Sequence, residues 1–255
     1  MFARPGLCGI GIGRLGLVAA SAYAQSVIVS QAYDPHYANV SLLLHGDGAD
    51  NGTVFTDNSP TPKTVTAYGN AKISTAQSKF GGASCNFPGS STDYAIIPTS
   101  SDFAFGTGDF TIEAWLYIPT WISGSYAAIC DIRATPQGNN STLFKINSSR
   151  QLGYYSASEI NTTSSVPLAT WTHVAICRSS GTTRLFIDGV LGATATDNDD
   201  KTSRHCYIGR VYDNAHPAFS GYIDDLRITK GVARYTESFT PPAAAFPNYG
   251  QPVYV

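Results

Sequence analysis

The chain has 255 residues, and charged side chains make up only 13% of them, with 16 Lys and Arg against 18 Asp and Glu. An ordinary globular domain carries about 25% charged residues, whereas the 43% of hydrophobic residues is ample for a buried core. This composition excludes disorder over most of the length. The formal net charge of -2 argues against a protein that binds nucleic acid through its phosphates.

Residues 1–39 differ in composition from the rest of the chain. They are rich in Gly, Ala and Ser and show no regular alternation, so we interpret them as an arm or linker. Ala22-Tyr23-Ala24 before Gln25 resembles a signal-peptidase site, but Arg14 and several glycines interrupt the apolar stretch. A retained arm and a cleaved signal peptide both stay open. No apolar run approaches the roughly 18 to 20 residues of a membrane span, so we expect none.

From Val40 onward, short apolar segments alternate with clusters of Gly, Asn, Asp, Ser and Pro, which is typical of β-strands joined by turns. No stretch of a dozen residues has a helical period. The spacing predicts an all-β fold in which two antiparallel sheets pack as a sandwich. The predicted strands are 40–44, 64–68, 84–87, 94–97, 110–118, 126–131, 142–146, 152–155, 173–178, 183–187, 192–196, 206–210 and 221–229.

The predicted strand 110–118 has two different faces. Every second residue from Phe110 to Ile118 is apolar, which predicts that this face packs against the other sheet. The opposite face carries Glu113 and Trp115, as expected for a surface that loops cover or that forms a groove. Further along, Asp188-Gly189 separates two short strand segments and is the strongest hairpin signal in the chain.

The cysteines do not follow a metal or redox pattern. Their number is odd and no C-x-x-C occurs, which argues against a zinc ribbon or a thioredoxin-type site. We interpret them as buried free thiols, although the sequence leaves a disulfide such as Cys177 with Cys206 open. The five are Cys8, Cys85, Cys130, Cys177 and Cys206.

Several motifs, taken together and in order, resemble the laminin G-like, concanavalin A-like jelly rolls of bacteriophage virion proteins. The resemblance covers about residues 38 to 247, and the last motif, followed by FTPP at 239–242, looks most like the phage branch. The motifs are SLLLHGDG at 41–48, FGGAS at 80–84, FGTGDFTIEAW at 105–115, WTHVA at 171–175, LFIDG at 185–189 and GYIDDLRITKGVARY at 221–235.

This resemblance implies a jelly roll over residues 40–249, with one concave sheet and a short tail at 250–255. It implies a non-enzymatic virion protein, either a head decoration or head fibre or a tail-fibre component, in which residues 1–39 bind other virion proteins. Such fibres are usually homotrimers, because a repeated binding face gains avidity. The alternative is a secreted, extracellular bacterial lectin or carbohydrate-binding module that has lost residues 1–24.

The resemblance also implies a structural Ca²⁺ that ties the first strand to the last. Calcium prefers carboxylate and carbonyl oxygens, and the matching position in the last strand is Asp224. Asp47 and the carbonyls near Gly46 or Gly82 would complete the site. The alternative is that Asp47 only forms a turn and that Asp224 pairs with an arginine.

A lectin-like surface is the third implication, with a cell-surface or environmental glycan as partner. Sugar rings stack on exposed aromatic rings, and their hydroxyls bind Asn, Asp and backbone amides. The alternative is that these aromatics cover sheet edges or subunit contacts. The candidate residues are Trp121, Tyr126, Tyr154, Tyr155, Tyr212 and Asn214.

Catalysis is not expected. Related glucanases use carboxylates in a Glu-x-Asp pattern on one strand face, but here Asp109 and Glu113 lie about 13 Å apart on a strand, outside the roughly 5 to 9.5 Å that glycoside hydrolysis needs. No G-x-S-x-G motif occurs. His173, between Trp171 and Ala175 in alternation, is interpreted as a packed strand histidine.

Overall fold

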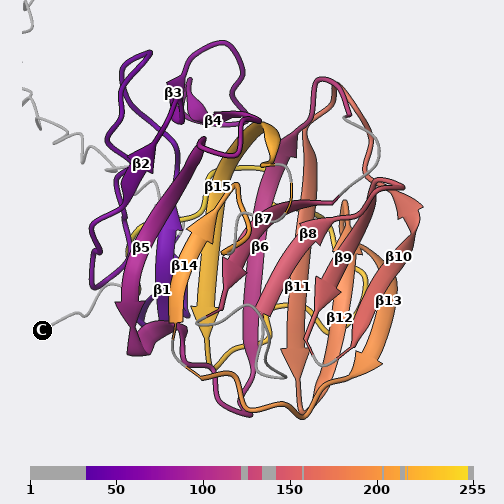
Figure 1. Cartoon of the computed structure of the whole chain (residues 1–255). Coiled ribbons are helices and arrows are strands. Elements are labelled where there is room, and N and C mark those ends of the chain that lie inside the picture. Colours follow the sequence, from indigo (N-terminus) through magenta and orange to yellow (C-terminus); the bar gives the residue numbers. More distant parts are fainter. Residues whose placement is uncertain are drawn as a thin grey trace, which may run out of the picture. The chain divides into compact units, whose positions relative to one another are not determined.

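Two antiparallel sheets pack face to face in the computed structural model, which describes residues 33–121, 126–133, 142–156, 158–202, 204–212, 216 and 218–251 (Figure 1). Sheet A has the order β13 (Val190–Thr196), β12 (Thr182–Ile187), β11 (Thr172–Ser179), β6 (Phe110–Tyr117), β15 (Ser220–Lys230), β4 (Ser84–Pro88) and β3 (Lys72–Ser74), and β1 (Val40–Leu44) also pairs with β15. Sheet B has the order β10 (Glu159–Ser165), β9 (Gln151–Tyr155), β8 (Thr142–Ile146), β7 (Ala127–Ile132), β14 (Arg204–Ile208), β5 (Tyr94–Ser100) and β2 (Thr66–Tyr68).

The predicted all-β jelly-roll sandwich is confirmed. Each predicted strand overlaps an observed one, and the structure adds β3 and β10. The helical elements of the described chain are two short 3-10 turns, η1 (Tyr37–Asn39) and η2 (Ser101–Phe103), the second capped by the Ser100 side chain, which accepts a hydrogen bond from the Asp102 amide. No helix in the described ranges is long and apolar enough to cross a membrane.

The long strand β15 pairs with three other strands of sheet A. It pairs with β6 along one side, and on the other side with β4 through residues 220–223 and with β1 through residues 226–229. The change of partner coincides with a bulge between Asp224 and Arg227, where Asp225 has a φ of 51°. A non-glycine residue with positive φ is costly unless its surroundings hold it. Here the Asp225 side chain is held by His45, at 2.5 Å, and by the amide of Phe246.

The core lies between the sheets and is formed by alternate residues of the strands. Phe110, Ile112, Ala114, Leu116 and Ile118 all belong to it, as the alternation in 110–118 predicts. Side chains from sheet B, among them Phe144 and Ile146, meet them from the opposite side and are fully buried. The two sheets therefore share one continuous apolar layer, whose burial is the main driving force for folding.

The outer face of sheet A is covered by residues 231–250, which we call the C-terminal strap. Ala233, Tyr235 and Phe239 of the strap pack on Ala175, Cys177 and Phe186 of sheet A. In the turn between β12 and β13, Asp188 and Gly189 both have positive φ, as in a type I′ hairpin. The strap contacts this turn, since the Phe239 amide donates to the Gly189 carbonyl. A Cβ atom on Gly189 would lie 1.9 Å from the carbonyl oxygen of Phe239, so a glycine is required there.

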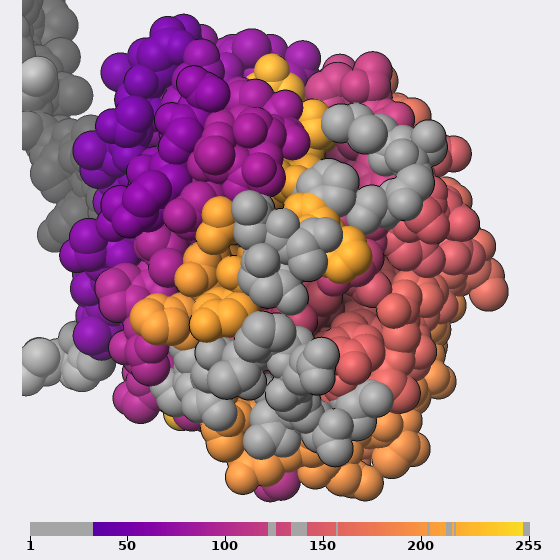
Figure 2. Space-filling view, in the orientation of Figure 1, coloured from indigo at the N-terminus to yellow at the C-terminus, as the bar shows by residue number. Residues whose placement is uncertain are grey.

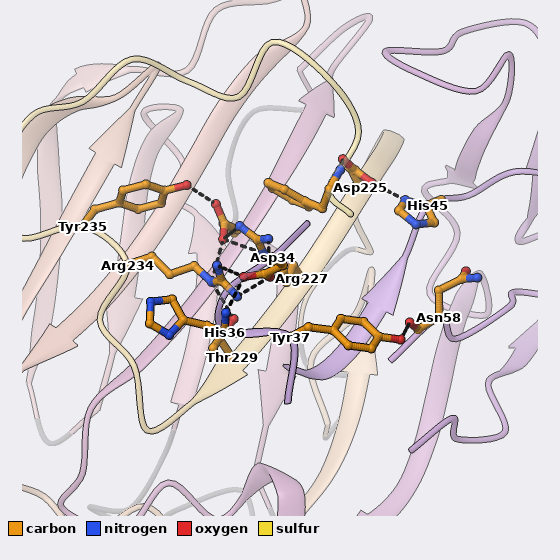
Figure 3. A network of polar contacts seen from close by, with 12 residues as sticks. Asp34, His36, Tyr37, His45, Asn58, Asp225, Arg227, Thr229, Arg234 and Tyr235 are labelled. Carbon is orange, nitrogen blue, oxygen red and sulfur yellow. Dashed lines mark hydrogen bonds and ion pairs between the residues drawn. The ribbon is translucent and has the colours of Figure 1, made fainter. Parts of the chain in front are cut away.

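Beneath the strap lies a buried network of charged residues, shown in Figure 3. Glu113 of β6 accepts hydrogen bonds from Arg227 Nη2 at 2.7 Å and from Tyr235 Oη at 2.8 Å. Asp34 binds Arg227 Nη1 at 3.0 Å and Arg234 Nη2 at 2.7 Å. Glu113 is completely buried and Asp34 is 3% exposed. The network therefore joins the start of the described chain, two strands of sheet A and the strap.

The charge balance of this network controls the ionisation of its acids. Burial alone would raise the pKa of Glu113, but Arg227, Arg234 and the adjacent His173 together outweigh it and hold that pKa far below its usual range. Burial likewise opposes the hydrogen bond from Arg234, which lowers the pKa of Asp34. Both carboxylates are therefore ionised at neutral pH, and His173, fully buried as expected, lies 3.3 Å from Glu113.

The folded unit begins before the boundary predicted from the sequence. Residues 34–39, predicted from the sequence to belong to the arm, are bound to the sandwich. The Asp34 amide donates to the Tyr249 carbonyl at 3.0 Å, and the Tyr37 hydroxyl donates to the Asn58 carbonyl at 2.8 Å. Residues 1–32 and 252–255 lie outside the described residues.

The cysteines of the described chain are free and buried, as predicted, and Cys8 lies outside it. Cys177 and Cys206 do not meet, because Cys177 faces the strap and Cys206 faces the core between the sheets. The neighbour of Cys206 is Cys130, with the two Sγ atoms 3.4 Å apart. Burial raises the pKa of the Cys177 thiol to about 12, so it is not ionised at neutral pH.

Replacing Glu113 should destabilise the fold strongly. We expect Glu113→Gln to lower the free energy of unfolding by about 3 kcal/mol or more, because it leaves two buried arginines facing a single carboxylate. Urea denaturation at pH 7 measures the change. The matched control is Glu237→Gln, which removes an exposed carboxylate of the strap and should stay within about 0.5 kcal/mol of the parent. Equal effects of the two variants would contradict a stabilising role for the network.

Candidate functional site

The strap does not cover the outer face of sheet B, although in the described chain Val211 and Tyr126 pack there on Ala128 of β7 and Leu143 of β8. This face is turned towards the viewer in Figure 2, with β2 and β5 in indigo to magenta, the β14 region in orange and β8 to β10 in pink to salmon. Strand parity places polar and aromatic side chains there, since the alternate residues fill the core. We therefore sought the candidate site on this face.

The strand register aligns one row of side chains across sheet B. Glu159 of β10 lies opposite Tyr155 of β9, which lies opposite Leu143 of β8. Leu143 in turn lies opposite Asp131 of β7, which lies opposite Tyr207 of β14. Cross-strand neighbours of this kind have Cβ atoms about 5 Å apart. The row thus brings together residues that are far apart in sequence.

One end of the row forms a polar and aromatic cluster, which we call the Tyr155 patch: Tyr126, Lys145, Tyr155, Glu159 and Asn161. Lys145 Nζ lies 2.8 Å from Glu159 Oε2 and 4.2 Å from the centre of the Tyr126 ring. Asn161 Nδ2 donates to Glu159 Oε1 at 3.0 Å. Burial raises the pKa of Glu159, but the hydrogen bonds from Lys145 and Asn161 and the charge of Lys145 together outweigh it and lower that pKa overall. The carboxylate is therefore ionised at neutral pH.

The accessible polar group of the patch is the Glu159 carboxylate. Asn161 Oδ1 is buried and has no hydrogen-bond partner within the described chain, and the Glu159 side chain is 39% exposed. Gly153 between them is needed for space, because a Cβ atom on it would lie 2.6 Å from Asn161 Oδ1. Tyr155 is 37% exposed beside these groups. An exposed ring next to a half-exposed carboxylate is an arrangement that can bind a hydroxyl-rich molecule.

The other end of the face carries a column of flat groups, which we call the Tyr68 column: Tyr68, Tyr94 and Arg210. The Tyr68 and Tyr94 rings are stacked, with centroids 4.8 Å apart and planes 6° from parallel. The Arg210 guanidinium carbon lies 3.6 Å from the centre of the Tyr94 ring. Tyr207 lies 6.0 Å from Tyr94 and joins the column to the row described above.

The structure brings some of the predicted sugar-binding residues together and separates others. Tyr126 and Tyr155 share the Tyr155 patch, and the Tyr212 ring lies 5.6 Å from the Tyr207 ring. Trp121 is half-buried against the core and donates from Nε1 to the Ser148 carbonyl. Asn214 lies outside the described residues.

Tyr154 does not belong to this face. Its ring is 2% exposed, and its hydroxyl donates to Asp197 Oδ2 at 2.9 Å. The physical reason is strand alternation, because neighbouring residues on β9 face opposite sides of the sheet. Tyr154 is therefore a core residue, and Tyr155 alone of the pair faces outward.

Several residues of the face were missed in the sequence. Tyr94, Lys145 and Tyr207 occupy the polar positions of strands that were predicted, so parity within those strands could have found them. Glu159 and Asn161 lie on β10, which was not predicted. Tyr68 closes a predicted strand, but its stacking on Tyr94 depends on the pairing of β2 with β5, which the sequence does not reveal.

The predicted calcium ligands lie where β1 ends and β15 bulges. Asp224 Oδ2 accepts hydrogen bonds from the amides of Lys79 and Phe80 at 2.7 and 3.1 Å. Its other oxygen, Oδ1, is buried with no partner among the described residues. Asp224 therefore does not pair with an arginine of the described chain. Asp47 lies close to Gly81, where a Cβ atom would come within 1.8 Å of Asp47 Oδ1.

These residues fit a cation only in part. The orphaned oxygen of Asp224 is the kind of group that a cation would bind. However, no three His, Cys, Asp or Glu side chains of the described chain are grouped so that they could hold a metal. A calcium ion here would need carbonyl oxygens and water in addition to Asp47 and Asp224. Calcium therefore stays a prediction.

A comparison with protein families shows to which family the chain belongs. A family model of the laminin G type, described as the concanavalin A-like lectin/glucanases superfamily, matches residues 88–236, more than half of the chain. The chain belongs to this family. A search of curated proteins found no match.

Solved structures share the fold at low sequence identity. Domain 4 of the extracellular arabinanase AbnA from Geobacillus stearothermophilus, in complex with arabinotriose, has a TM-score of 0.56 at 18% identity over 77% of this chain and 94% of that one. The binding domain of botulinum neurotoxin DC, in complex with SialylT, has 0.56 at 20% over 77% and 49%. Trypanosoma rangeli sialidase has 0.54 at 16% over 76% and 31%. The chain thus spans half or less of the last two.

The ionisation of Asp224 should make stability depend on pH. Burial, reinforced by repulsion from Asp225 and Asp47, raises the pKa of Asp224 to about 7. The folded state thus holds this proton more tightly than the unfolded state, and stability falls as pH rises from about 4 through 7. With EDTA present, we expect a lower melting temperature at pH 8 than at pH 5.5. In Asp224→Asn the difference should shrink.

Adding calcium to the same samples tests the metal prediction. A bound Ca²⁺ would favour the ionised carboxylate, so it should raise the melting temperature of the parent at pH 8 and leave Asp224→Asn unchanged. A parent protein that melts at the same temperature in EDTA and in millimolar Ca²⁺ would refute the calcium site. The pH dependence itself would not be affected by that result.

Proposed function

We propose that the chain is a non-enzymatic carbohydrate-binding protein whose ligand docks on the outer face of sheet B, at the Tyr155 patch. The observation that carries this proposal is the exposed ring of Tyr155 directly opposite the half-exposed carboxylate of Glu159. Sugar hydroxyls can donate to this carboxylate, and the apolar face of a sugar ring can stack on Tyr155. Lys145 and Asn161, which both donate to Glu159, keep the carboxylate in place.

Family membership and fold support this proposal. The arabinanase domain was solved with arabinotriose and the toxin binding domain with SialylT, so sandwiches of this fold occur in structures with bound carbohydrate. At 18% and 20% identity the likeness extends to the fold alone. The choice of the Tyr155 patch therefore rests on the contacts of this chain.

The placement of carboxylates supports a binding protein over a hydrolase. Glu113 is sealed beneath the strap. On the outer face of sheet B, Asp131 binds Arg133 at 2.5 Å and is completely buried. Glu159 lies three strands away from Asp131, about 14 Å at the usual strand spacing, beyond the roughly 5 to 9.5 Å that glycoside hydrolysis requires.

For the biological setting we propose a bacteriophage virion, in which the domain is a head decoration, head fibre or tail-fibre component. The phage-type motif at 221–235 supports it, as does the low content of charged residues, 13%. The residues before the sandwich would bind other virion proteins, and a homotrimer would repeat the binding face. The second candidate, favoured by Ala22-Tyr23-Ala24, is a secreted bacterial lectin.

The mass of the native protein separates these two settings. A virion protein that keeps its arm should be found in purified particles with a mass that includes residues 1–24. A secreted lectin should instead begin at Gln25 and occur in the culture medium. Intact-mass spectrometry of both fractions measures this directly, and a species that begins at Gln25 and is absent from particles would refute the virion setting.

Removing the Tyr155 ring should weaken sugar binding. We expect Tyr155→Ala to reduce the affinity for glycans selected on an array about fivefold to tenfold, because one aromatic stacking contact contributes about 1 kcal/mol. Isothermal titration calorimetry measures the affinities. Tyr154→Phe is the matched control, since it removes a buried hydroxyl from the neighbouring residue and should lower stability without changing affinity. No glycan binding by the parent protein, or equal affinities for parent and Tyr155→Ala, would contradict the proposal.

A further inference from the structure

We infer that Cys130 and Cys206 are joined by a disulfide bond when the chain folds in an oxidising compartment, and that the closed sandwich then keeps whichever thiol state folding produced. This modification site lies in the core of sheet B and is independent of the proposed carbohydrate binding. Its reaction partner is a small disulfide such as oxidised glutathione. The inference rests on the contact between the two sulfurs, on the strand register and on the burial of both side chains.

The two sulfurs are already in contact. Cys130 Sγ and Cys206 Sγ lie 3.4 Å apart, and they must approach by about 1.4 Å to reach the length of a disulfide bond. The other cysteines of the described chain, Cys85 and Cys177, lie in sheet A on strands β4 and β11. These strands are three steps apart, about 14 Å at the usual spacing. Among the described residues, the pair in sheet B is therefore the one that a disulfide can join.

The strand register sets the geometry of this pair. Tyr207 of β14 lies directly opposite Asp131 of β7, and the residues just before them, Cys206 and Cys130, lie on the core face at either side of that pair. Such diagonal neighbours have Cα atoms about 7 to 8 Å apart, whereas most disulfides span about 4.4 to 6.8 Å. Bond formation thus requires a small approach of two strands that are already hydrogen-bonded to each other.

Burial decides when the bond can form. Both side chains are completely buried and belong to the core between the sheets, so an oxidant cannot reach them in the closed sandwich. The contact with Cys206, reinforced by burial, raises the pKa of the Cys130 thiol well above its usual range, and the thiolate is the reactive form. The bond therefore forms during folding, while β7 and β14 pair and before sheet A covers them.

The reaction is a thiol–disulfide exchange in two steps. The thiolate of one cysteine attacks a sulfur of oxidised glutathione, forms a mixed disulfide and releases one glutathione thiolate. The thiolate of the second cysteine then attacks the protein sulfur of the mixed disulfide, which forms the bond between Cys130 and Cys206 and releases the second glutathione. The protein loses two protons and two electrons, and oxidised glutathione gains them as two thiols.

The bond closes a long loop that contains part of the candidate site. The two cysteines are 76 positions apart, and β8 to β13 lie between them in the chain. Tyr155 and Glu159 of the Tyr155 patch are therefore inside the loop. Closing a loop of this length lowers the entropy of the unfolded chain and so stabilises the folded state.

Refolding of the full chain under two redox conditions tests the inference. The reduced, denatured chain is diluted into dithiothreitol or into a mixture of oxidised and reduced glutathione, and free thiols are then alkylated in denaturant. After refolding with glutathione, mass spectrometry of the digest should find peptides linked through Cys130 and Cys206. After refolding with dithiothreitol, both should be alkylated. We expect the linked protein to melt about 5 to 10 °C higher than the reduced protein.

The same two forms test the protection by the closed sandwich. Under native conditions, dithiothreitol should leave the linked form intact for hours, and oxidised glutathione should leave the reduced form unchanged over the same time. In concentrated urea both reactions should be complete within minutes, because unfolding exposes the sulfurs. If the linked form is reduced as fast under native conditions as in urea, the retention of the thiol state is refuted.

Four variants act as controls. Cys130→Ala and Cys206→Ala should each abolish the difference in melting temperature between the two refolding conditions, whereas Cys85→Ala and Cys177→Ala should keep it. Each variant is compared with itself, so the cost of the substitution does not enter the difference. Mass spectrometry of the parent decides the result even if a variant does not fold. If the parent refolded with glutathione has all its cysteines alkylated, or if the linked peptides contain other cysteines, the inference is overturned.

Discussion

The buried pairing of Glu113 with Arg227 is the interaction on which the arrangement of the molecule depends. A carboxylate cannot remain ionised in an apolar sandwich without cationic partners, and Arg227 on the adjacent strand supplies one at 2.7 Å. Arg227 then needs a second anion, which Asp34 provides, and Asp34 in turn binds Arg234 of the strap. Because Glu113 must be neutralised, the start of the folded unit and the strap are both bound over sheet A. The strap therefore does not cover the outer face of sheet B, where the candidate site lies.

Much of this fold could be predicted from the sequence, because strand parity and turn residues are local signals. The apolar face of 110–118 and the Asp188-Gly189 hairpin both occur as predicted. β10 was missed because Ile160 is the one apolar residue in a run of Glu, Asn, Thr and Ser, so an edge strand looked like a loop. β3 has three residues, too few for alternation to show. The cover over Glu113 could not be predicted, since it depends on contacts between Asp34 and residues about 200 positions away.

The sequence predicted the chemical character of the candidate site, but not most of the residues that form it. Tyr126, Tyr155 and Tyr212 were selected as aromatic residues in polar surroundings, and all three lie on sheet B or next to it. Tyr154 was selected with Tyr155, although adjacent strand residues must face opposite ways. The residues that give the patch its polarity, Lys145 and Asn161, meet only because β8, β9 and β10 pair in one register. Single-sequence patterns describe each strand by itself, and a site built across strands depends on which of them are neighbours.

The hydrogen bond between the Asp34 amide and the Tyr249 carbonyl has a consequence for how the sandwich can be connected to other chains. Because the first and last residues of the folded unit meet, and because both lie on the sheet A side, polypeptide attached at either one departs from a single point. A sandwich with adjoining ends can be inserted into a surface loop of a host protein without separating the ends of that loop. Held at this point, the domain would turn its sheet B face outward whichever end carried the tether.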